Sequence, residues 1–368
     1  MDSTVVFSRD SGEVSGVRDE MGHYLISVQG DAPGKRIEIS DSAVGFGRDQ
    51  AGDVVISDTA VSRRHMQCSV LNNELIVSDL GSTNGTFLDG ERLAAPAIVP
   101  DGSIIQLGQQ IYKYELRSKQ DVAKSEELDR DLDKASNYVL SLLPDPIRRG
   151  AVQTDWFYLP SAALGGDAFG YYELDDEHFV AYVVDVSGHG VGAAMHSVTV
   201  LNVLRQRALP NTDFLNPAAV LESLNEMFQM DTHDGQYFTI WYGVYNKRTR
   251  LMRYATAGHH AGYLVPADRA SHIPLQTKSL MIGAMPGYSY KCDEATMPAG
   301  STLYLFSDGV FEILTHDGKQ WTLDDFLPLL SDPMDPQDEP QRLFQAVRNI
   351  SQPGPFDDDF SLLVVTFE

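Results

Sequence analysis

Four short acidic motifs in the second half of the chain constrain its fold more than any other feature. They are GGDAFG (165–170), VVDVSGHG (183–190), LFSDGV (305–310) and FDDDFSLLVV (356–365). Three of them place an aspartate where an apolar strand meets a loop, and such strand ends can converge at one edge of a layered β-structure. A cluster of unpaired carboxylates is electrostatically unfavourable unless cations neutralise it. The motifs therefore predict an α+β sandwich with a divalent-metal site.

The residue types of these motifs also restrict the chemistry. Oxygen-only ligands favour Mg²⁺ or Mn²⁺ over zinc, and the chain has no His/Cys spacing typical of a zinc site. Two such ions about 3.5–4 Å apart can hold one water as hydroxide and polarise a phosphoryl oxygen, so no nucleophilic side chain is needed. Ser187 does not lie in a G-x-S-x-G motif, which argues against a serine hydrolase. Neither Cys68 nor Cys292 is followed six residues later by arginine, which excludes a Cys-x5-Arg thiol phosphatase loop.

Length and charge narrow the class of protein further. The chain has 368 residues, a length that suits two domains. Its formal net charge of −24 would repel phosphate backbones and anionic lipid, so we expect neither nucleic acid nor membrane as a partner. The N-terminal residues do not have the pattern of a signal peptide, and no apolar run approaches the ~20 residues of a membrane span. We therefore expect a cytoplasmic protein.

The composition and the hydrophobic pattern of the sequence change three times along the chain. We expect a flexible N-terminus (1–21), an all-β sandwich (22–117), a helical linker (118–146) and a mixed α and β domain (147–368). Short strands separated by turn signals indicate the sandwich. In the last domain we expect a buried strand at 179–186, a helix from about 192 to 208, a second helix opened by Asn216-Pro217, and a hairpin around 246–249.

The linker carries a short heptad pattern. Its apolar positions are Leu128, Leu132, Ala135, Val139 and Leu142. This pattern is compatible with an amphipathic helix packed on its own domain and also with a linker helix that forms a homodimer. Pro144 and Pro146 end the helix.

Polar residues at predicted turns of the first domain form an anion-binding pattern. Arg48 offers a planar fork for a phosphate, and Ser62 and Thr83 can donate hydroxyl hydrogen bonds to the same oxygens. Asn84 can bond to the backbone of an extended peptide, and Gly85 permits the turn. No acid, base or nucleophile accompanies them, so the pattern indicates a binding site on loops.

The ordered set Gly47-Arg48, Ser62-Arg63-Arg64-His65 and STNGT (82–86) resembles a forkhead-associated (FHA) domain. The resemblance implies a phosphothreonine-containing partner held by Arg48, Ser62 and Thr83. It also implies peptide contacts from Asn84 and Arg63, and structural roles for His65 and Gly85. A β-sandwich that keeps the pattern only for packing or dimerisation is the alternative.

The second half resembles the PPM-type (protein phosphatase 2C-like) metal-dependent phosphatases, and in particular their bacterial stage II sporulation and sigma-regulator branch. GGD, D-x-SGHG, AGHH, SDG and DD-x-S occur in that order over residues 139–368. The resemblance implies an αββα sandwich that binds two or three Mn²⁺ or Mg²⁺ ions. The implied catalytic residues are Asp167, Asp185, Asp308 and Asp358. The implied metal contacts add the Val186 carbonyl and, as an accessory ligand, Asp359.

One position departs from this pattern. Relatives in the branch often have GGD-x-x-D, whereas this chain has Gly170 at the second acid, which puts a supporting or third-metal contact in doubt. The expected function is a metal-dependent serine/threonine protein phosphatase whose FHA domain recruits or senses a phosphothreonine protein. The alternative is a catalytically weak scaffold or dimer module that signals through its FHA domain alone.

Overall fold

The computed structural model describes residues 19–232, 235–332 and 338–368. The chain divides into two compact units, with the division between Arg130 and Asp131. Most of the expected flexible segment 1–21 lies outside the described residues, and the first strand begins at Met21.

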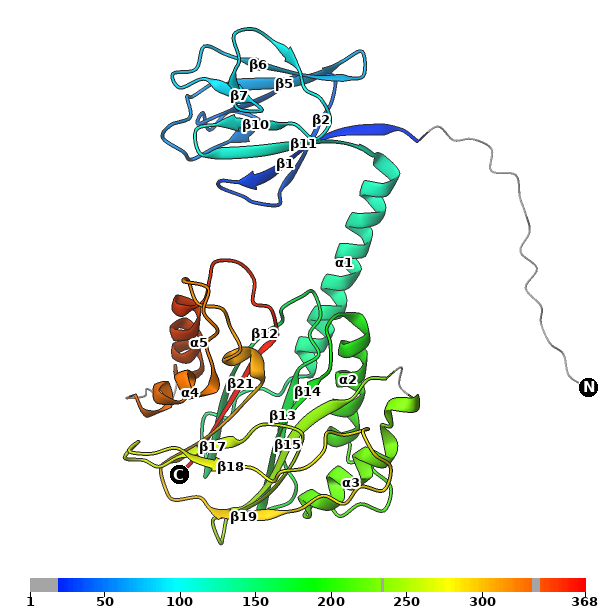
Figure 1. Cartoon of the computed structure of the whole chain (residues 1–368), viewed down its shortest axis with the longest axis vertical. Helices are drawn as coiled ribbons and strands as arrows, with labels where there is room; N and C mark the ends of the chain where they lie inside the picture. Colours follow the sequence, from blue (N-terminus) through cyan, green and yellow to red (C-terminus); the bar gives the residue numbers. More distant parts are fainter. Residues whose placement is uncertain (1–18, 233–234, 333–337) are drawn as a thin grey trace, which may run out of the picture. The chain divides into compact units, whose positions relative to one another are not determined.

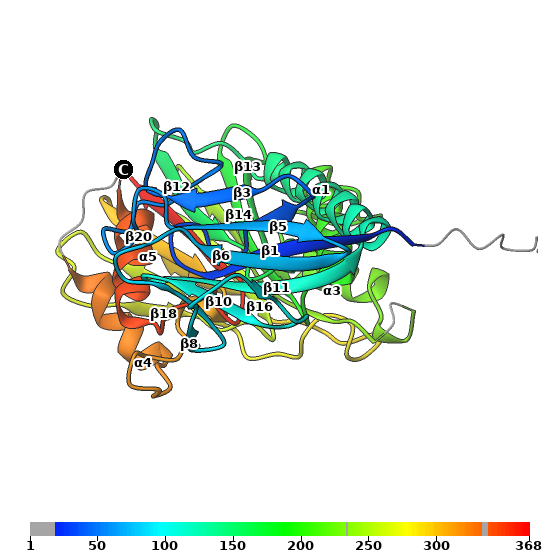
Figure 2. The same ribbon diagram turned by 90° about the horizontal axis from the view of Figure 1, so that it is seen from above.

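The N-terminal unit is a sandwich of two β-sheets. One sheet has the strand order β2 (Arg36–Ile39), β1 (Met21–Gln29), β11 (Gln110–Ser118), β10 (Ile104–Leu107), β7 (Thr86–Leu88) and β8 (Glu91–Arg92). The other has the order β4 (Val54–Val55), β3 (Val44–Gly47), β5 (Met66–Leu71), β6 (Glu74–Asp79) and β9 (Ala97–Ile98). Figure 2 shows β3, β5 and β6 side by side.

Alternating burial along the strands explains this sandwich. In β11, Tyr112 and Tyr114 are buried while Lys113 between them is partly exposed, and in β6 the same pattern buries Leu75 and Val77. A strand that buries every second side chain presents one face to a core and the other to water. Because both sheets follow this pattern, their buried faces pack together around Phe46.

The two units are connected along the chain by α1 (Lys119–Leu142). On this helix Leu128 is 61 % exposed, whereas Leu132, Ala135, Val139 and Leu142 are partly buried. Most of the heptad stripe therefore has some cover within the chain itself, and a homodimer through this helix stays a prediction. Among the helices of the described residues, none combines the length and apolarity of a membrane span.

The C-terminal unit contains two five-stranded antiparallel sheets. The first has the order β12 (Val152–Leu159), β21 (Phe360–Phe367), β20 (Ser301–Phe306), β17 (Gly262–Val265) and β18 (Ile273–Leu275). The second has the order β13 (Ala168–Glu173), β14 (His178–Val186), β15 (Phe238–Asn246), β16 (Leu251–Ala257) and β19 (Asp293–Thr296).

Helices cover the outer face of each sheet. The helices α2 (Val191–Arg205) and α3 (Pro217–Met227) contact strands of the second sheet, while α5 (Glu339–Ile350) contacts β12 and β21 of the first. The short α4 (Leu323–Phe326) lies near α5 (Figure 1). This arrangement confirms the αββα sandwich expected for the second half of the chain.

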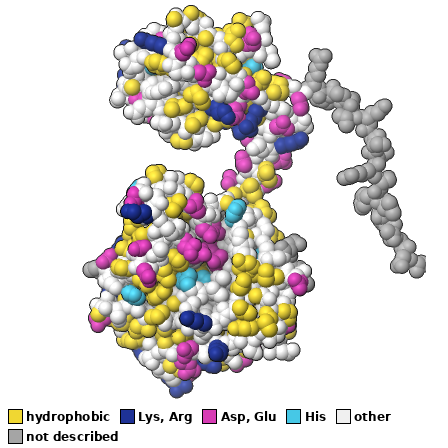
Figure 3. Space-filling model, in the orientation of Figure 1, with side chains coloured by type: hydrophobic (Ala, Val, Ile, Leu, Met, Phe, Trp, Pro, Cys, Tyr) yellow, Lys and Arg dark blue, Asp and Glu magenta, His cyan; other side chains and the backbone are white. Residues whose placement is uncertain are grey.

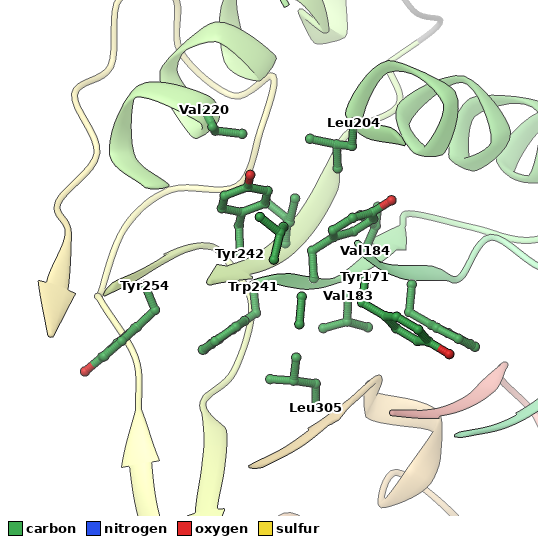
Figure 4. Packing of buried hydrophobic residues seen from close by; sticks show 14 of the residues in the cluster. Tyr171, Val183, Val184, Leu204, Val220, Trp241, Tyr242, Tyr254 and Leu305 are labelled. Atoms are coloured by element: carbon green, nitrogen blue, oxygen red, sulfur yellow. The ribbon is translucent and has the colours of Figure 1, made fainter. Parts of the chain in front are cut away.

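Packing on both faces makes the central strands almost entirely apolar. Trp241 and Tyr242 are neighbours on β15, so their side chains point to opposite faces of the sheet. Figure 4 shows Tyr242 on the side of Leu204 and Val220 from the helices, and Leu305 of the other sheet on the opposite side. Both β15 residues are fully buried because helices cover one face and the second sheet covers the other.

The predicted elements of this unit agree with the structure except in detail. The hairpin of β15 and β16 is present, with its turn between Asn246 and Leu251. The helix expected at 192–208 spans Val191–Arg205. Asn216 stands at the N-cap of α3 and Pro217 follows it, but the Asn216 side chain makes no capping hydrogen bond.

Candidate active site and phosphopeptide groove

The acidic residues of the four motifs lie at the ends of strands from both sheets of the C-terminal unit. Asp167 directly precedes β13, and Asp185 is the second-last residue of β14. Asp308 opens a short 3-10 turn after β20, and Asp358 stands two residues before β21. Figure 3 shows acidic side chains gathered on one face of this unit, with histidines beside them.

Glycines allow the four motifs to approach one another closely. A Cβ atom at Gly166 would come 2.8 Å from the Val186 carbonyl oxygen, so only glycine lets this loop lie against the end of β14. Likewise, a Cβ atom at Gly309 would come within 2.2 Å of the Asp359 carbonyl oxygen. Real Cβ atoms do not approach other atoms so closely, and the glycines of the GGD and SDG motifs are therefore required by contact.

Hydrogen bonds to the Asp359 side chain connect the GGD loop to the start of β21. Its Oδ1 accepts hydrogen bonds from the backbone N–H and the hydroxyl of Ser161, at 2.7 and 3.0 Å. Its Oδ2 accepts from the N–H groups of Gly166 at 2.6 Å and Asp167 at 3.3 Å. The Asp359 carbonyl accepts from the Ser307 hydroxyl at 3.0 Å. Both carboxylate oxygens of Asp359 therefore accept hydrogen bonds from protein groups, and these bonds fix the position of Asp167. A role of Asp359 as an accessory metal ligand stays a prediction.

Burial and mutual repulsion raise the pKa of the clustered carboxyl groups. Desolvation, followed by the charges of Asp308 and Asp358, raises the pKa of Asp185 to about 7. Asp167 is only 4 % exposed, and burial followed by the charge of Asp185 raises its pKa well above the usual range. Burial also raises the pKa of Asp308 and Asp358. The carboxylates are therefore close enough to repel one another.

These residues fit divalent cations by their chemistry. Asp167 Oδ2 is buried and has no hydrogen-bond partner among the described residues, and the other ligand atoms are carboxylate oxygens and a carbonyl oxygen, which Mg²⁺ and Mn²⁺ prefer. Within residues 19–232, 235–332 and 338–368, no three acidic, histidine or cysteine side chains are already arranged to hold an ion. The carboxylates would have to draw together around a cation, and the relief of their repulsion would favour that movement.

We expect divalent cations to stabilise the C-terminal unit, and more strongly at pH 8 than at pH 6. The folded protein holds the Asp185 proton up to pH about 7, whereas an ordinary aspartate releases it near 3.8, so ionisation destabilises the cation-free unit between these values. A cation binds the ionised form and offsets this effect by about 3 kcal/mol at a hundred times its Kd. Thermal unfolding of EDTA-treated protein with added Mg²⁺ or Mn²⁺ measures the difference. Equal stabilisation at both pH values would contradict the assignment of Asp185 as a ligand.

The structure also shows what surrounds Gly170. The three atoms nearest to a Cβ added there all belong to the Tyr182 side chain, with the hydroxyl at 2.3 Å. Gly170 pairs with Tyr182 across β13 and β14, and Tyr182 is fully buried. The space next to residue 170 is thus filled by Tyr182, and the absence of an acid here leaves the cluster of Asp167, Asp185, Asp308 and Asp358 intact.

Three histidines and one unpredicted glutamate border the cluster. His259 forms hydrogen bonds with the Thr239 hydroxyl at 2.6 Å and the Phe306 carbonyl at 3.1 Å, which links the ends of two strands. Burial keeps the pKa of His259 well below its usual range and lowers that of His260 to about 4, so both are neutral and packed. His189 is exposed, and its charge opposes the increase in the pKa of Asp358. Glu312 lies one turn after Asp308, and its charge adds to the effect of burial, which is the larger cause of the raised pKa of Asp308.

The phosphate-binding residues predicted in the N-terminal unit line one groove of about 620 Å³. Arg48, Ser62, Arg63, Thr83 and Asn84 all border it. The Arg48 Nε–H donates to the Val61 carbonyl at 2.6 Å, which directs the two terminal amino groups away from that bond. The Thr83 N–H donates to Ser62 Oγ at 3.0 Å, so the two hydroxyl side chains stand together. Asn84 Nδ2 donates to the Ala60 carbonyl at 2.7 Å, which fixes the peptide-facing loop.

His65 and Asp79 hold the two loops of this groove in place. His65 is fully buried; its Nδ1 accepts from the Ser62 N–H at 3.0 Å, and its Nε2 bonds to the Gly85 carbonyl at 3.1 Å. Gly85 has a φ of 86°, which favours glycine. Asp79 accepts four hydrogen bonds from Gly81, Ser82 and Thr86. Burial alone would raise the pKa of Asp79, but these donors outweigh it and lower the pKa to about 2.

Replacement of Asp79 by alanine should destabilise the N-terminal unit by about 2–3 kcal/mol. The change removes the acceptor of four hydrogen bonds and leaves the donors of the 81–86 loop unpaired. The loss of stability is measured by urea unfolding of the full chain, in which the unfolding transition of the N-terminal unit is monitored. Asp41→Ala, at an exposed aspartate of the same unit, is the control and should change the stability by less than about 0.5 kcal/mol. Equal effects of both variants would show that Asp79 does not brace the loop.

Sequence reasoning placed most of these residues correctly at turns and strand ends but missed several that support them. No individual role was predicted for Ser161, Asp79, Ser82 or Glu312. Ser82 is the first residue of the STNGT motif and Asp79 lies three residues before it, which is a signal that could have found them. Ser161 and Glu312 carry no motif of their own, and only their contacts identify them.

Comparison with known proteins gives two family matches. The model described as stage II sporulation protein E (SpoIIE) matches residues 175–368, and that of the FHA domain matches residues 44–108. The phosphoserine phosphatases RsbU and RsbP of Bacillus subtilis are 27 % and 28 % identical over 194 and 187 residues, which cover 52 % and 50 % of this chain. They cover 57 % and 45 % of the relatives, so the chain spans about half the length of these curated relatives.

The N-terminal unit and the fold have relatives as well. The FHA domain-containing protein FhaB of Mycobacterium tuberculosis is 36 % identical over 92 residues, which cover 25 % of this chain and 59 % of that protein. The SiaA-PP2C domain of Pseudomonas aeruginosa has the same fold as the C-terminal unit, with a TM-score of 0.58 at 20 % identity over 67 % of this chain and 99 % of that one. The SpoIIE match covers more than half of the residues and includes Asp185, Asp308 and Asp358, whereas Asp167 lies before its first residue. The chain therefore belongs to the SpoIIE family, with an FHA domain in its N-terminal unit.

Proposed function

We propose that this chain is a metal-dependent serine/threonine protein phosphatase that also binds a phosphothreonine protein through its FHA domain. The observation that carries the proposal is the convergence of Asp167, Asp185, Asp308 and Asp358. Their largest electrostatic interactions among the described residues are with other carboxylates, so the site has an excess of negative charge. An oxygen-lined site of this kind is suited to divalent cations and, through them, to a phosphate ester.

Different residues of the cluster would bind the ions from different sides. Asp185 and the Val186 carbonyl at the end of β14 would hold the ions from one side, Asp308 and Asp358 would hold them from the other, and Asp167 would act directly or through water. When bound, two or three Mn²⁺ or Mg²⁺ ions would supply an activated water and polarise the phosphoryl group. Asp359 and Ser161 would keep Asp167 in position, and the glycines would keep the loops close. Two relatives are named as phosphoserine phosphatases, which supports this reaction type.

The FHA groove would recruit or sense the partner. Its arginine fork and paired hydroxyl groups suit a phosphate on a threonine, and binding there would raise the local concentration of a phosphoprotein near the second unit. The substrate would be a protein phosphorylated on serine or threonine. A homodimer through α1 and a location in the cytoplasm also remain predictions.

Phosphate release from synthetic phosphopeptides tests the enzymatic proposal. We expect the full chain with Mn²⁺ to hydrolyse peptides that carry phosphoserine or phosphothreonine, and EDTA to abolish the activity. No release from either peptide, with phosphothreonine binding retained, would instead support a scaffold that signals through its FHA domain alone.

A further inference from the structure

A wide hollow of about 830 Å³ lies at the end of the N-terminal sandwich opposite the phosphopeptide groove. The strand β3 runs from the loop of Ser42, which lines the hollow, to Arg48 of the groove. The strand β5 runs the other way, from the groove to the turn of Asn73, which also lines the hollow. Since the six residues of β5 span about 20 Å, the hollow is separate from the phosphate-binding loops.

This end of the sandwich is where the linker helix begins. Met21 of β1 pairs with Ser118, the last residue of β11, and α1 starts at the next residue, Lys119 (Figure 1). The Val70 N–H donates to the Ser40 carbonyl at 2.9 Å, which holds the loop after β2 against the end of β5. Hydrogen bonds of the sandwich itself therefore form the wall of the hollow.

The lining of the hollow is strongly acidic. Its carboxylates are those of Asp19, Glu20, Glu38 and Asp41. Lys119 is the one lysine or arginine that lines the hollow among the described residues, and its Nζ is already shared between Glu20 at 2.8 Å and Glu38 at 3.6 Å. Four carboxylates against one ammonium group leave an excess of negative charge, which favours a cationic ligand.

A buried histidine provides an independent indication of a ligand. His23 lines the hollow, is only 4 % exposed, and forms a hydrogen bond between its Nδ1 and the Tyr114 hydroxyl at 2.7 Å. Its Nε2 has no hydrogen-bond partner among the described residues. The two nitrogens of an imidazole ring point in nearly opposite directions, so the bond to Tyr114 directs Nε2 toward the hollow. When Nδ1–H donates to Tyr114, Nε2 keeps a lone pair that can accept a hydrogen bond from a ligand.

The positions of these groups favour an extended basic ligand over a metal ion. Glu38 pairs with Tyr24, the neighbour of His23, so the Glu38 and His23 side chains lie on opposite faces of the sheet. Metal ligands have to meet within about 2–2.6 Å of one ion, which two groups on opposite faces of a sheet do not. Arginine side chains carry several hydrogen-bond donors on a long stem and can reach separate acceptors along one surface.

We propose that the hollow is a docking site for an arginine-rich segment of a partner protein. His23 Nε2 would accept a hydrogen bond from one guanidinium group, and the surrounding carboxylates would neutralise the positive charge of the segment. The site lies apart from both the acidic cluster and the phosphopeptide groove, and it depends on neither proposed activity. Because Lys119 lines the hollow, a bound segment would contact the first residue of the linker helix.

The test measures the binding of a fluorescein-labelled peptide of alternating arginine and glycine to the full chain at low salt. We expect it to bind at least about tenfold more tightly than the same peptide with citrulline, which has the shape of arginine without its charge. Glu38→Gln combined with Asp41→Asn should weaken the arginine peptide at least about tenfold, and both residues are exposed, so the fold should be kept. The control, Glu91→Gln with Glu127→Gln, removes two exposed charges of the same unit outside the hollow and should stay within about twofold.

Nuclear magnetic resonance of the histidine-labelled full chain gives the second readout. The ring signal that is missing in His23→Gln should shift when the arginine peptide is added to the wild type, and it should stay in place when the same amount is added to the Glu38→Gln and Asp41→Asn double variant. This result, with weakened binding in that variant alone, supports the docking site. Equal binding of the arginine and citrulline peptides, equal weakening in both double variants, or an unmoved His23 signal in the wild type would each overturn it.

Discussion

Asp185→Asn is expected to lower kcat/KM for the Mn²⁺-dependent hydrolysis of p-nitrophenyl phosphate at least about a thousandfold. Asp185 lies at the centre of the cluster, where the charges of Asp308, Asp358 and Asp359 all act on it. An amide there keeps the shape of the side chain but removes the anionic ligand, and a loss of about 4 kcal/mol of transition-state stabilisation corresponds to this factor. The measurement is the rate at several Mn²⁺ concentrations for both proteins.

Asp357→Asn provides the matched control, because Asp357 is an exposed acid directly beside Asp358. We expect this variant to retain activity within about threefold of the wild type, a change that amounts to less than 1 kcal/mol. Calorimetric Mn²⁺ binding gives a second readout, in which Asp185→Asn should bind more weakly and Asp357→Asn should not. A large loss in Asp357→Asn, with Asp358→Asn active, would show that the metal-binding position at the start of β21 is shifted by one residue.

Arg48→Ala is expected to weaken the binding of a phosphothreonine peptide at least about a hundredfold. Charge-assisted hydrogen bonds to a phosphate contribute about 1.5–3 kcal/mol each, and Arg48 can form two of them with its terminal amino groups. The Nε–H is already bonded to the Val61 carbonyl, so the guanidinium is fixed in place before the ligand binds. Fluorescence anisotropy with a labelled peptide measures the affinity.

Two further variants separate the role of the Arg48 fork from that of charge alone. Arg48→Lys keeps the charge but loses the planar pair of donors, so we expect an affinity between those of the wild type and Arg48→Ala. Arg117→Ala removes the same charge from an exposed site on β11, where Arg117 pairs with Glu115, and should bind the peptide like the wild type. Equal weakening of peptide binding by Arg48→Ala and Arg117→Ala would show a general effect of net charge. It would contradict the assignment of Arg48 as a phosphate ligand.

Much of the fold could be predicted because its signals are local. The alternating residues of β6 and β11, the continuous apolar run at 179–186 and the turn at 246–249 are each determined by the immediate environment of a strand. The short strands β4, β7, β8 and β9 were not predicted. A strand of two or three residues has no periodicity to detect, and it forms only because a neighbouring strand offers hydrogen-bond partners.

The sequence by itself determined which residues could carry the chemistry: aspartates before or after apolar strands, an arginine and hydroxyl residues at turns, and glycines beside them. Tertiary structure decided how each one is used. The bond between Gly166 and Asp359 joins residues 193 positions apart, and it occupies a carboxylate that sequence alone placed at a metal. Tyr182 fills the space beside Gly170, and the phosphopeptide groove beside Arg48 opens between loops. Such outcomes depend on how distant segments pack, and that packing follows from the whole core and from no single motif.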